Sequence, residues 1–411
     1  MKNIKIMIGF LLVSFFAKGQ QLQSYIQEAQ SNNPKIKAYE LRYDIAQEKI
    51  SEGNRIPNTE FGVGYFISEP ETRTGAQVAR FSVKQMLPWF GTVSARQKYA
   101  TAMAQTEYVD YVVAKRKLGL IVAQSYYKLH SLQEKQNIVD KNIQLLKTYE
   151  KLALQSIEVA KASAIDVLRL QIRQNELLQQ KEILQEQFIA EQANFNSLLN
   201  RDTNLSLPKI PKMELPNADL ITMDSLQLNP ELLRYDKMYE SVIQAELLNQ
   251  KESAPVFGVG LDYIPVQAHS QQEHQHHSNV ADNGKDVVMP MVSLSIPLFN
   301  KRYNSRTKQN ELRKQEINLQ KQERLNGLKS ALAKAVSQRN KARITFNSQT
   351  KNLKQAKDAE QILIKNYETG TIDFNDVLDI QELQLKFELN QIQSVQLYHM
   401  QSAMINYIIN K

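Results

Sequence analysis

The two halves of this chain repeat one another, and the repeat limits the fold more than any other feature. Four blocks recur in the same order: Asn33-Pro34 as Asn229-Pro230, Phe61-Gly62-Val63-Gly64 as Phe257-Gly258-Val259-Gly260, Val83 to Phe90 as Val292 to Phe299, and Ile165-Asp166-Val167-Leu168 as Asn375-Asp376-Val377-Leu378. Self-similarity of this kind indicates one structural unit that occurs twice. The fold must therefore contain the same order of elements in each half.

Each half predicts the order helix, strand, loop, strand, very long helix, break and shorter helix. We place the repeats at residues 20–200 and 222–411, joined by a proline-containing linker at 201–221. The first repeat has predicted strands at about 58–68 and 77–88 and predicted helices at about 92–159 and 166–199. The second has predicted strands at about 255–265 and 286–297 and predicted helices at about 301–368 and 376–410.

The predicted strands alternate in character from residue to residue. One face of the first strand carries Phe61, Val63 and Tyr65, whereas glycines such as Gly62 and Gly258 occupy the other face of their strands. Strands of about nine to eleven residues can cross a bilayer when tilted. Four strands cannot close a useful barrel, and lipid does not tolerate open edges, so membrane insertion would require several copies of the chain.

The stretches 92–159 and 301–368 contain no proline and almost no glycine. Each has about 68 residues, so a continuous helix would extend roughly 100 Å. In the first stretch, apolar residues at alternating spacings of three and four predict a coiled-coil seam: Leu118, Val122, Leu129, Leu132, Val139, Ile143, Leu146, Ala153 and Ile157. Polar Ser125, Gln136 and Glu150 interrupt this seam.

The first residues predict export. A signal peptide at 1–19 is indicated by Lys2 and Lys5, an apolar run at 6–16 and the small residues of Ala17-Lys18-Gly19.

The chain has no cysteine, which excludes disulfides, thiolate catalysis and the lipid anchor of bacterial lipoproteins. No later stretch is apolar enough for a membrane-spanning helix, so a membrane location would depend on the strands. The net charge of +8 comes from interleaved acidic and basic residues, which argues against a nucleic-acid partner.

Together these features resemble the TolC-type family of outer-membrane efflux proteins. The resemblance covers the whole mature chain and rests on these motifs: Asn32-Asn33-Pro34, Leu87-Pro88-Trp89-Phe90-Gly91, Ile296-Pro297-Leu298-Phe299, and Tyr367-Glu368-Thr369-Gly370-Thr371 followed by Asp376-Val377-Leu378. It implies a mainly α-helical fold with a membrane β-barrel, in which coiled-coil hairpins form a periplasmic α-barrel. Four strands per subunit would contribute to a shared twelve-stranded, trimeric β-barrel. The implied partners are a periplasmic adaptor, an inner-membrane RND-type pump and outer-membrane lipid, with no cofactor.

The resemblance also implies where the channel closes and where the barrel meets the helices. The predicted tip or aperture residues are Ser163, Asp166, Tyr367, Gly370, Ile372, Asp373 and Asp376. The predicted barrel–helix junction contains Pro88, Trp89, Phe90, Pro297 and Phe299. An Asp near a helix start can also cap free backbone N–H groups, and this structural role for Asp166 and Asp376 remains an alternative. In a three-fold assembly an inward Asp would form a ring that attracts cations.

Four of the six histidines fall in one predicted extracellular loop, at His269, His274, His276 and His277. Imidazole is a good ligand for copper, zinc and nickel, so a metal site is one interpretation and an exposed polar loop is the other. With the family resemblance, the loop favours the heavy-metal branch of the family (CusC/CzcC-like). The isolated His130 and His399 are predicted to be surface or packing residues on helices.

Two alternatives compete with a metal-efflux duct, and the second belongs to another class of protein. A drug-efflux or type I secretion duct would have the same architecture. A soluble periplasmic coiled-coil adaptor would explain export and the helical hairpins, but not two pairs of bilayer-length strands that end at proline. The sequence contains no HExxH, GxSxG, P-loop or GxGxxG motif, so we predict no enzymatic activity.

Overall fold

The computed structural model describes residues 21–158, 163–216, 223–268, 282–369, 371–372 and 374–410. The predicted signal peptide lies outside these residues. The described chain forms two compact units, and each unit combines segments from both halves of the sequence. The first, the helical unit, comprises the described parts of Met1–Glu40, Asp110–Leu232 and Glu323–Lys411. The second, the sheet unit, comprises Leu41–Val109 and Leu233–Gln322.

Helices make up most of the described chain, as the predicted mainly α-helical fold requires. The bounds are α2 Pro34–Glu52, α3 Thr92–Glu158, α4 Ala164–Leu198, α5 Pro230–Glu252, α6 Arg302–Glu368 and α7 Phe374–Ile408, with a short 3-10 helix at Met223–Leu228. Residues 21–32 are also helical. Helices α3 and α6 have 67 residues each, and α4 and α7 have 35 each. Among the described helices, none combines the length and apolar character needed to cross a membrane.

The seam predicted along α3 forms the core of the helical unit. Its apolar residues from Leu118 to Ala153 are buried, and Ile157 is half-buried. The three polar interruptions each bond to α4: Ser125 Oγ donates to Glu191 Oε1 (2.5 Å), Gln136 Nε2 donates to Gln185 Oε1 (3.1 Å), and Glu150 accepts bonds from the Gln171 and Gln174 amides (2.8 Å each). Of these bonds only the one between Ser125 and Glu191 is buried, and since buried polar groups need partners, that pair fixes the register of α3 against α4.

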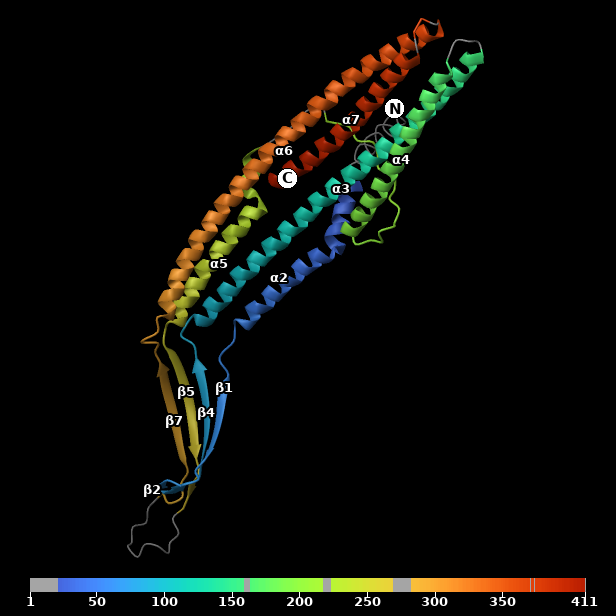
Figure 1. Cartoon of the computed structure of the whole chain (residues 1–411). Helices are drawn as coiled ribbons and strands as arrows, with labels where there is room; N and C mark the ends of the chain where they lie inside the picture. Colours follow the sequence, from blue (N-terminus) through green and yellow to red (C-terminus); the bar gives the residue numbers. More distant parts are fainter. Residues whose placement is uncertain are drawn as a thin grey trace, which may run out of the picture. The chain divides into compact units, whose positions relative to one another are not determined.

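The sheet unit contains an antiparallel sheet in the order β1-β4-β5-β7 (Figure 1). Its strands are β1 Thr59–Tyr65, β4 Ala79–Leu87, β5 Val256–Ile264 and β7 Val287–Ser295. A smaller sheet pairs β2 Glu71–Thr72, β3 Gly75–Gln77 and β6 Val266–Gln267. Residues predicted as one strand at about 77–88 are thus divided between β3 and β4. The chain changes sheet at Val78, whose N–H donates to Pro265 O and whose carbonyl accepts from Phe66 N.

The register of the larger sheet separates its residues into two faces. Phe61 pairs with Val83, and Val83 pairs with Leu261. Directly paired residues lie on the same face of an antiparallel sheet, so these side chains form one apolar face. On the opposite face, Gly62 pairs with Ser82, and Ser82 pairs with Asp262. The alternation therefore produces a sheet with one apolar face and one face of glycine, polar and methionine residues.

Candidate functional site

The apolar face of the sheet is exposed to an unusual degree. Phe61 is 78% exposed, Val63 77% and Val292 81%. The same face carries Phe81, Val83, Val259, Leu261, Tyr263, Val288 and Leu294, all of which are also exposed. Soluble monomers rarely expose a contiguous apolar surface of this extent, and such a surface marks contact with a membrane or another protein.

Aromatic side chains bound this face where the sheet meets the helices. The Trp89 ring stacks on the Phe257 ring, with centroids 5.3 Å apart and planes at 18°. Phe90 is 80% exposed and Phe299 is 99% exposed. The predicted junction residue Pro88 directly follows β4, and Pro297 lies two residues after the end of β7, where proline cannot continue the hydrogen-bonded ladder. The arrangement resembles the aromatic belts found at membrane–water interfaces.

The opposite face mixes polar residues, glycines and methionines, and it is crowded near its glycines. A Cβ atom at Gly258 would lie 2.3 Å from Ser293 Oγ and 2.7 Å from Met86 Sδ. Glycine therefore makes room for the side chains of both neighbouring strands. The fully buried Asp262 carboxylate forms an ion pair with Arg80, which supplies the countercharge that a buried carboxylate needs.

The N-terminus of α4 contains two of the predicted tip residues in one capping box. The Ser163 N–H donates to Asp166 Oδ2 (3.0 Å), and the Ile165 N–H donates to Ser163 Oγ (3.2 Å). Asp166 is buried, with 8% of its surface exposed. These bonds explain why α4 begins at Ala164, slightly before the predicted start. They also supply the structural role that the sequence left as an alternative for Asp166.

The turn between α6 and α7 is held by aromatic packing. The Tyr367 and Phe374 rings lie 4.9 Å apart, and buried Phe374 contacts Tyr149 edge-on at 5.8 Å. Ile372 is half-buried and Asp376 is exposed. The predicted tip residues Gly370 and Asp373 lie outside the described part of the chain.

A polar network near this turn was not predicted from the sequence. The Tyr149 hydroxyl donates to Glu360 Oε1 (2.7 Å), and Gln384 Nε2 donates to Glu360 Oε2 (2.8 Å). Gln381 Nε2 donates to the Tyr149 hydroxyl (3.2 Å). Burial, together with the bond to Glu360, raises the pKa of Tyr149. The repeat carried a signal for this network, because Gln381 is the counterpart of Gln171, which bonds to Glu150 on α3.

The histidines fall into two groups. The candidate metal ligands His269, His274, His276 and His277 lie outside the described residues, and the residues that are described contain no cluster of three or more His, Cys, Asp or Glu suited to a metal ion. His130 is buried on α3, where its Nε2 accepts the Met213 N–H (3.2 Å). His399 Nε2 lies 3.2 Å from the Glu214 carbonyl oxygen. Both residues thus hold the segment that follows α4.

Solved structures of known channels share this fold. VceC, an outer membrane protein of Vibrio cholerae, aligns with a TM-score of 0.73 and 16% identity over 95% of this chain and 96% of its own. CusC, for which transmembrane channel formation is described, aligns with a TM-score of 0.76 and 12% identity over 95% and 92%. The open-state MtrE outer membrane channel of Neisseria gonorrhoeae aligns with a TM-score of 0.71 and 14% identity over 94% and 88%.

These likenesses are in structure and not in sequence. No protein-family model and no curated protein matches the chain. The alignments nevertheless extend over nearly the whole chain and include the helices as well as the strands of the sheet unit. This chain therefore has the fold of bacterial outer-membrane channel proteins.

Proposed function

We propose that this protein is the outer-membrane channel subunit of a tripartite efflux system. It conducts substrate passively from an inner-membrane pump of the RND type, through a periplasmic adaptor, to the cell exterior. The observation that carries the proposal is the exposed apolar face of the sheet, bounded by Trp89, Phe90 and Phe299. An exposed surface of this kind becomes favourable when lipid covers it. The channel fold shared with VceC and CusC supports the same conclusion.

The unpaired edges of the sheet support assembly from several copies. In the described sheet β1 and β7 are the outer strands, and each presents backbone groups on one side without a neighbouring strand. Lipid cannot satisfy those groups, so a membrane-embedded sheet must close on further copies of itself. Three copies would supply twelve strands, the number that the family resemblance implies. The equal lengths of α3 and α6 fit the proposed duplication.

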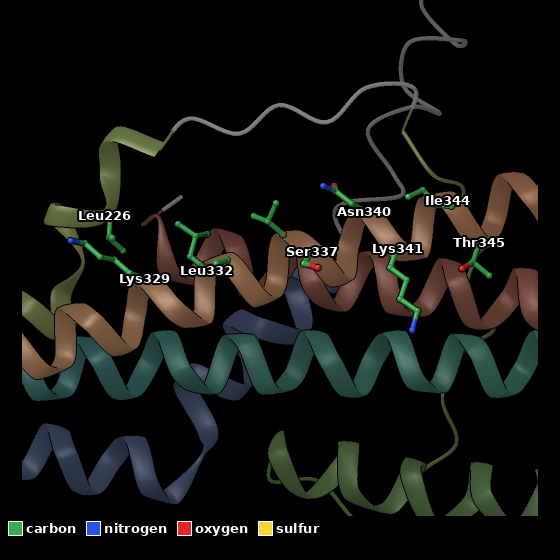
Figure 2. Close-up of a pocket in the computed structure, with 10 residues that line it drawn as sticks. Leu226, Lys329, Leu332, Ser337, Asn340, Lys341, Ile344 and Thr345 are labelled. Atoms are coloured by element: carbon green, nitrogen blue, oxygen red, sulfur yellow. The ribbon is translucent and has the colours of Figure 1, made fainter.

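A groove along α6 offers a further surface for a neighbouring copy. It has a volume of about 880 Å³ and is lined by Leu226, Leu332, Val336 and Ile344 among others (Figure 2). Ile344 is 69% exposed, and Leu319 on the same helix is 72% exposed. Long helices that expose apolar residues pack against other helices, and a second copy of the chain is the occupant that the proposed trimer provides.

The favoured substrates are heavy-metal cations such as copper or silver. They would enter the channel at its proposed periplasmic tip, which contains Ser163, Asp166, Tyr367 and Asp376. Asp166 combines capping with a negative charge, and three copies would place three such charges at the tip. The support for metal is the histidine-containing segment 269–277 of the sequence. Deletion of the gene tests this choice, because a metal duct predicts lower tolerance to copper, silver, zinc or cobalt. Unchanged tolerance to all four would argue for another substrate.

Channel activity is tested in planar lipid bilayers. Purified protein should insert and produce stepwise conductance without a pump, because the proposed transport is passive. Absence of conductance under conditions in which the protein is folded would count against the function.

A further inference from the structure

The end of the sheet that adjoins the helices combines exposed apolar and cationic side chains. We define this surface as the junction patch: Phe90, Leu298, Phe299, Lys251, Lys301 and Arg302. Phe90, Leu298 and Phe299 are 80%, 74% and 99% exposed. The three cationic residues are also exposed. All of them belong to the sheet unit.

Contacts around the last turn of α5 bring together the segments of chain that carry these residues. The Thr92 hydroxyl donates to the Lys251 carbonyl (3.5 Å), and the Asn249 amide donates to the Tyr303 carbonyl (3.0 Å). A Cβ atom on Gly91 would lie 3.7 Å from Lys251 Nζ, so this amine lies beside the backbone that follows Phe90. The first turns of α3 and α6 therefore meet at the end of α5, where the strands β4, β5 and β7 join the helices (Figure 1).

The segments that carry the exposed aromatic residues of this junction have cationic side chains and no acidic ones. Residues 72–106 and 287–310 contain no Asp or Glu. The carboxylates that do reach the junction come from the ends of α2 and α5. Glu252 lies 3.8 Å from Arg96 and 3.2 Å from Arg306, and Glu52 lies 3.5 Å from Arg55. Among the described residues, Lys251, Lys301 and Arg302 take part in no ion pair.

We propose that the junction patch binds the phosphate headgroups of anionic phospholipids in the leaflet that borders the helices. This inference rests on the proposed membrane location of the sheet. The apolar face is continuous with the patch through Trp89 and Phe257, so lipid that covers the face places its headgroups at Lys251, Lys301 and Arg302. Aromatic rings prefer that depth, and cations there are attracted to an anionic surface. Lipid headgroups therefore supply the countercharge to these three residues.

Trp89 provides a direct probe, because it is the only tryptophan in the chain. The detergent-solubilised full-length protein is titrated with phosphatidylglycerol that carries brominated acyl chains, and quenching of Trp89 fluorescence is recorded. A parallel titration uses phosphatidylcholine with the same chains. We expect phosphatidylglycerol to quench at a concentration at least tenfold lower, since each cation near an anionic surface contributes about fivefold in affinity.

Two matched variants test the assignment. The triple variant Lys251→Gln, Lys301→Gln, Arg302→Gln should bind the two lipids equally. The control triple variant Lys351→Gln, Lys354→Gln, Lys365→Gln removes three exposed cations elsewhere on α6, outside the groove, and should keep the preference. If the first triple variant does not fold, the single variants Lys301→Gln and Arg302→Gln should each reduce the preference about fivefold.

The outcomes separate this inference from the proposed function. Equal quenching of the wild-type protein by both lipids would overturn the lipid preference while leaving the membrane location intact. Quenching by neither lipid would instead contradict the membrane location itself. If millimolar inorganic phosphate removed the preference, the patch would be a site for free phosphate, and the lipid assignment would be wrong.

Discussion

The indole of Trp89 stacks on the ring of Phe257 at the end of the apolar face, with the ring planes only 18° apart. Trp89 follows the strand β4, whereas Phe257 lies at the start of β5, and Phe257 pairs with Leu87 in the sheet. The stacked pair therefore joins the first half of the chain to the second at the point where strands give way to helices.

Replacing Trp89 with alanine should destabilise the sheet unit. Aromatic pairs contribute about 0.5–1.5 kcal/mol beyond their buried area, and truncation of a large aromatic residue adds a packing loss. We expect a lower midpoint of thermal unfolding by circular dichroism in detergent. Phe299→Ala is the matched control, because Phe299 is 99% exposed and should leave the midpoint unchanged. Equal effects of both substitutions would contradict this role of the stacked pair.

Substitutions at Asp166 separate its capping role from a charge effect at the tip. Asp166→Ala removes the acceptor for the Ser163 N–H and should cost about 0.5–2 kcal/mol of stability. Asp166→Asn keeps an acceptor but loses the charge. If three Asp166 charges act on permeating ions, Asp166→Asn should retain stability and lower cation selectivity, measured as the reversal potential in a salt gradient. If the cation selectivity of the Asp166→Asn variant were unchanged, the role of Asp166 would be limited to capping α4.

Mild acid should weaken the helical unit through His130. Its Nε2 accepts the Met213 N–H, which requires the neutral ring, and burial lowers the pKa of His130 and of His399. A lowered folded-state pKa means that the stabilisation is present above the unfolded value of about 6.5 and is lost as the pH falls. We expect the midpoint temperature of thermal unfolding to decrease as the pH is lowered from about 7.5 to about 5.5.

The variant His130→Gln is the control for this pH dependence. Glutamine does not titrate, so its unfolding midpoint should depend less on pH over the same interval, with His399 accounting for the remainder. An identical pH dependence in both proteins would show that His130 does not contribute to it.

Two glycines in different strands of the first half should respond differently to replacement by alanine. Gly75 has a φ of +129°, and a Cβ there would lie 1.9 Å from the Gln267 carbonyl oxygen, which is backbone and cannot move aside cheaply. Gly75→Ala should therefore disrupt the β3–β6 pairing and lower the unfolding midpoint. Gly64→Ala should be neutral, because nothing lies within 4 Å of that position. A neutral Gly75→Ala variant would contradict the described pairing.

Periodic patterns allowed much of this fold to be predicted. The spacing from Leu118 to Ala153 predicted a buried seam because helix geometry repeats along a single element, and those residues are buried. The alternation at Phe61, Val63 and Tyr65 likewise predicted one apolar strand face, which the register of β1 and β4 confirms.

Features that depend on the path of the chain in three dimensions were not predicted. At Val78 the chain passes from one sheet to the other, with bonds to Phe66 and to Pro265, and Pro265 belongs to the other half of the sequence. His130 was assigned only a surface or packing role, because its partner Met213 lies in an irregular segment without periodicity. The Tyr149–Glu360 bond joins two helices whose contact no local pattern specifies.

The cellular location and the oligomeric mass of the protein test the central claim most directly. Cell envelopes would be fractionated, and the purified protein would be analysed by native mass spectrometry in detergent. The account predicts a protein that is extracted from the outer membrane only by detergent and has the mass of three chains. A freely soluble periplasmic monomer would contradict both the membrane location of the apolar face and the transport function that depends on it.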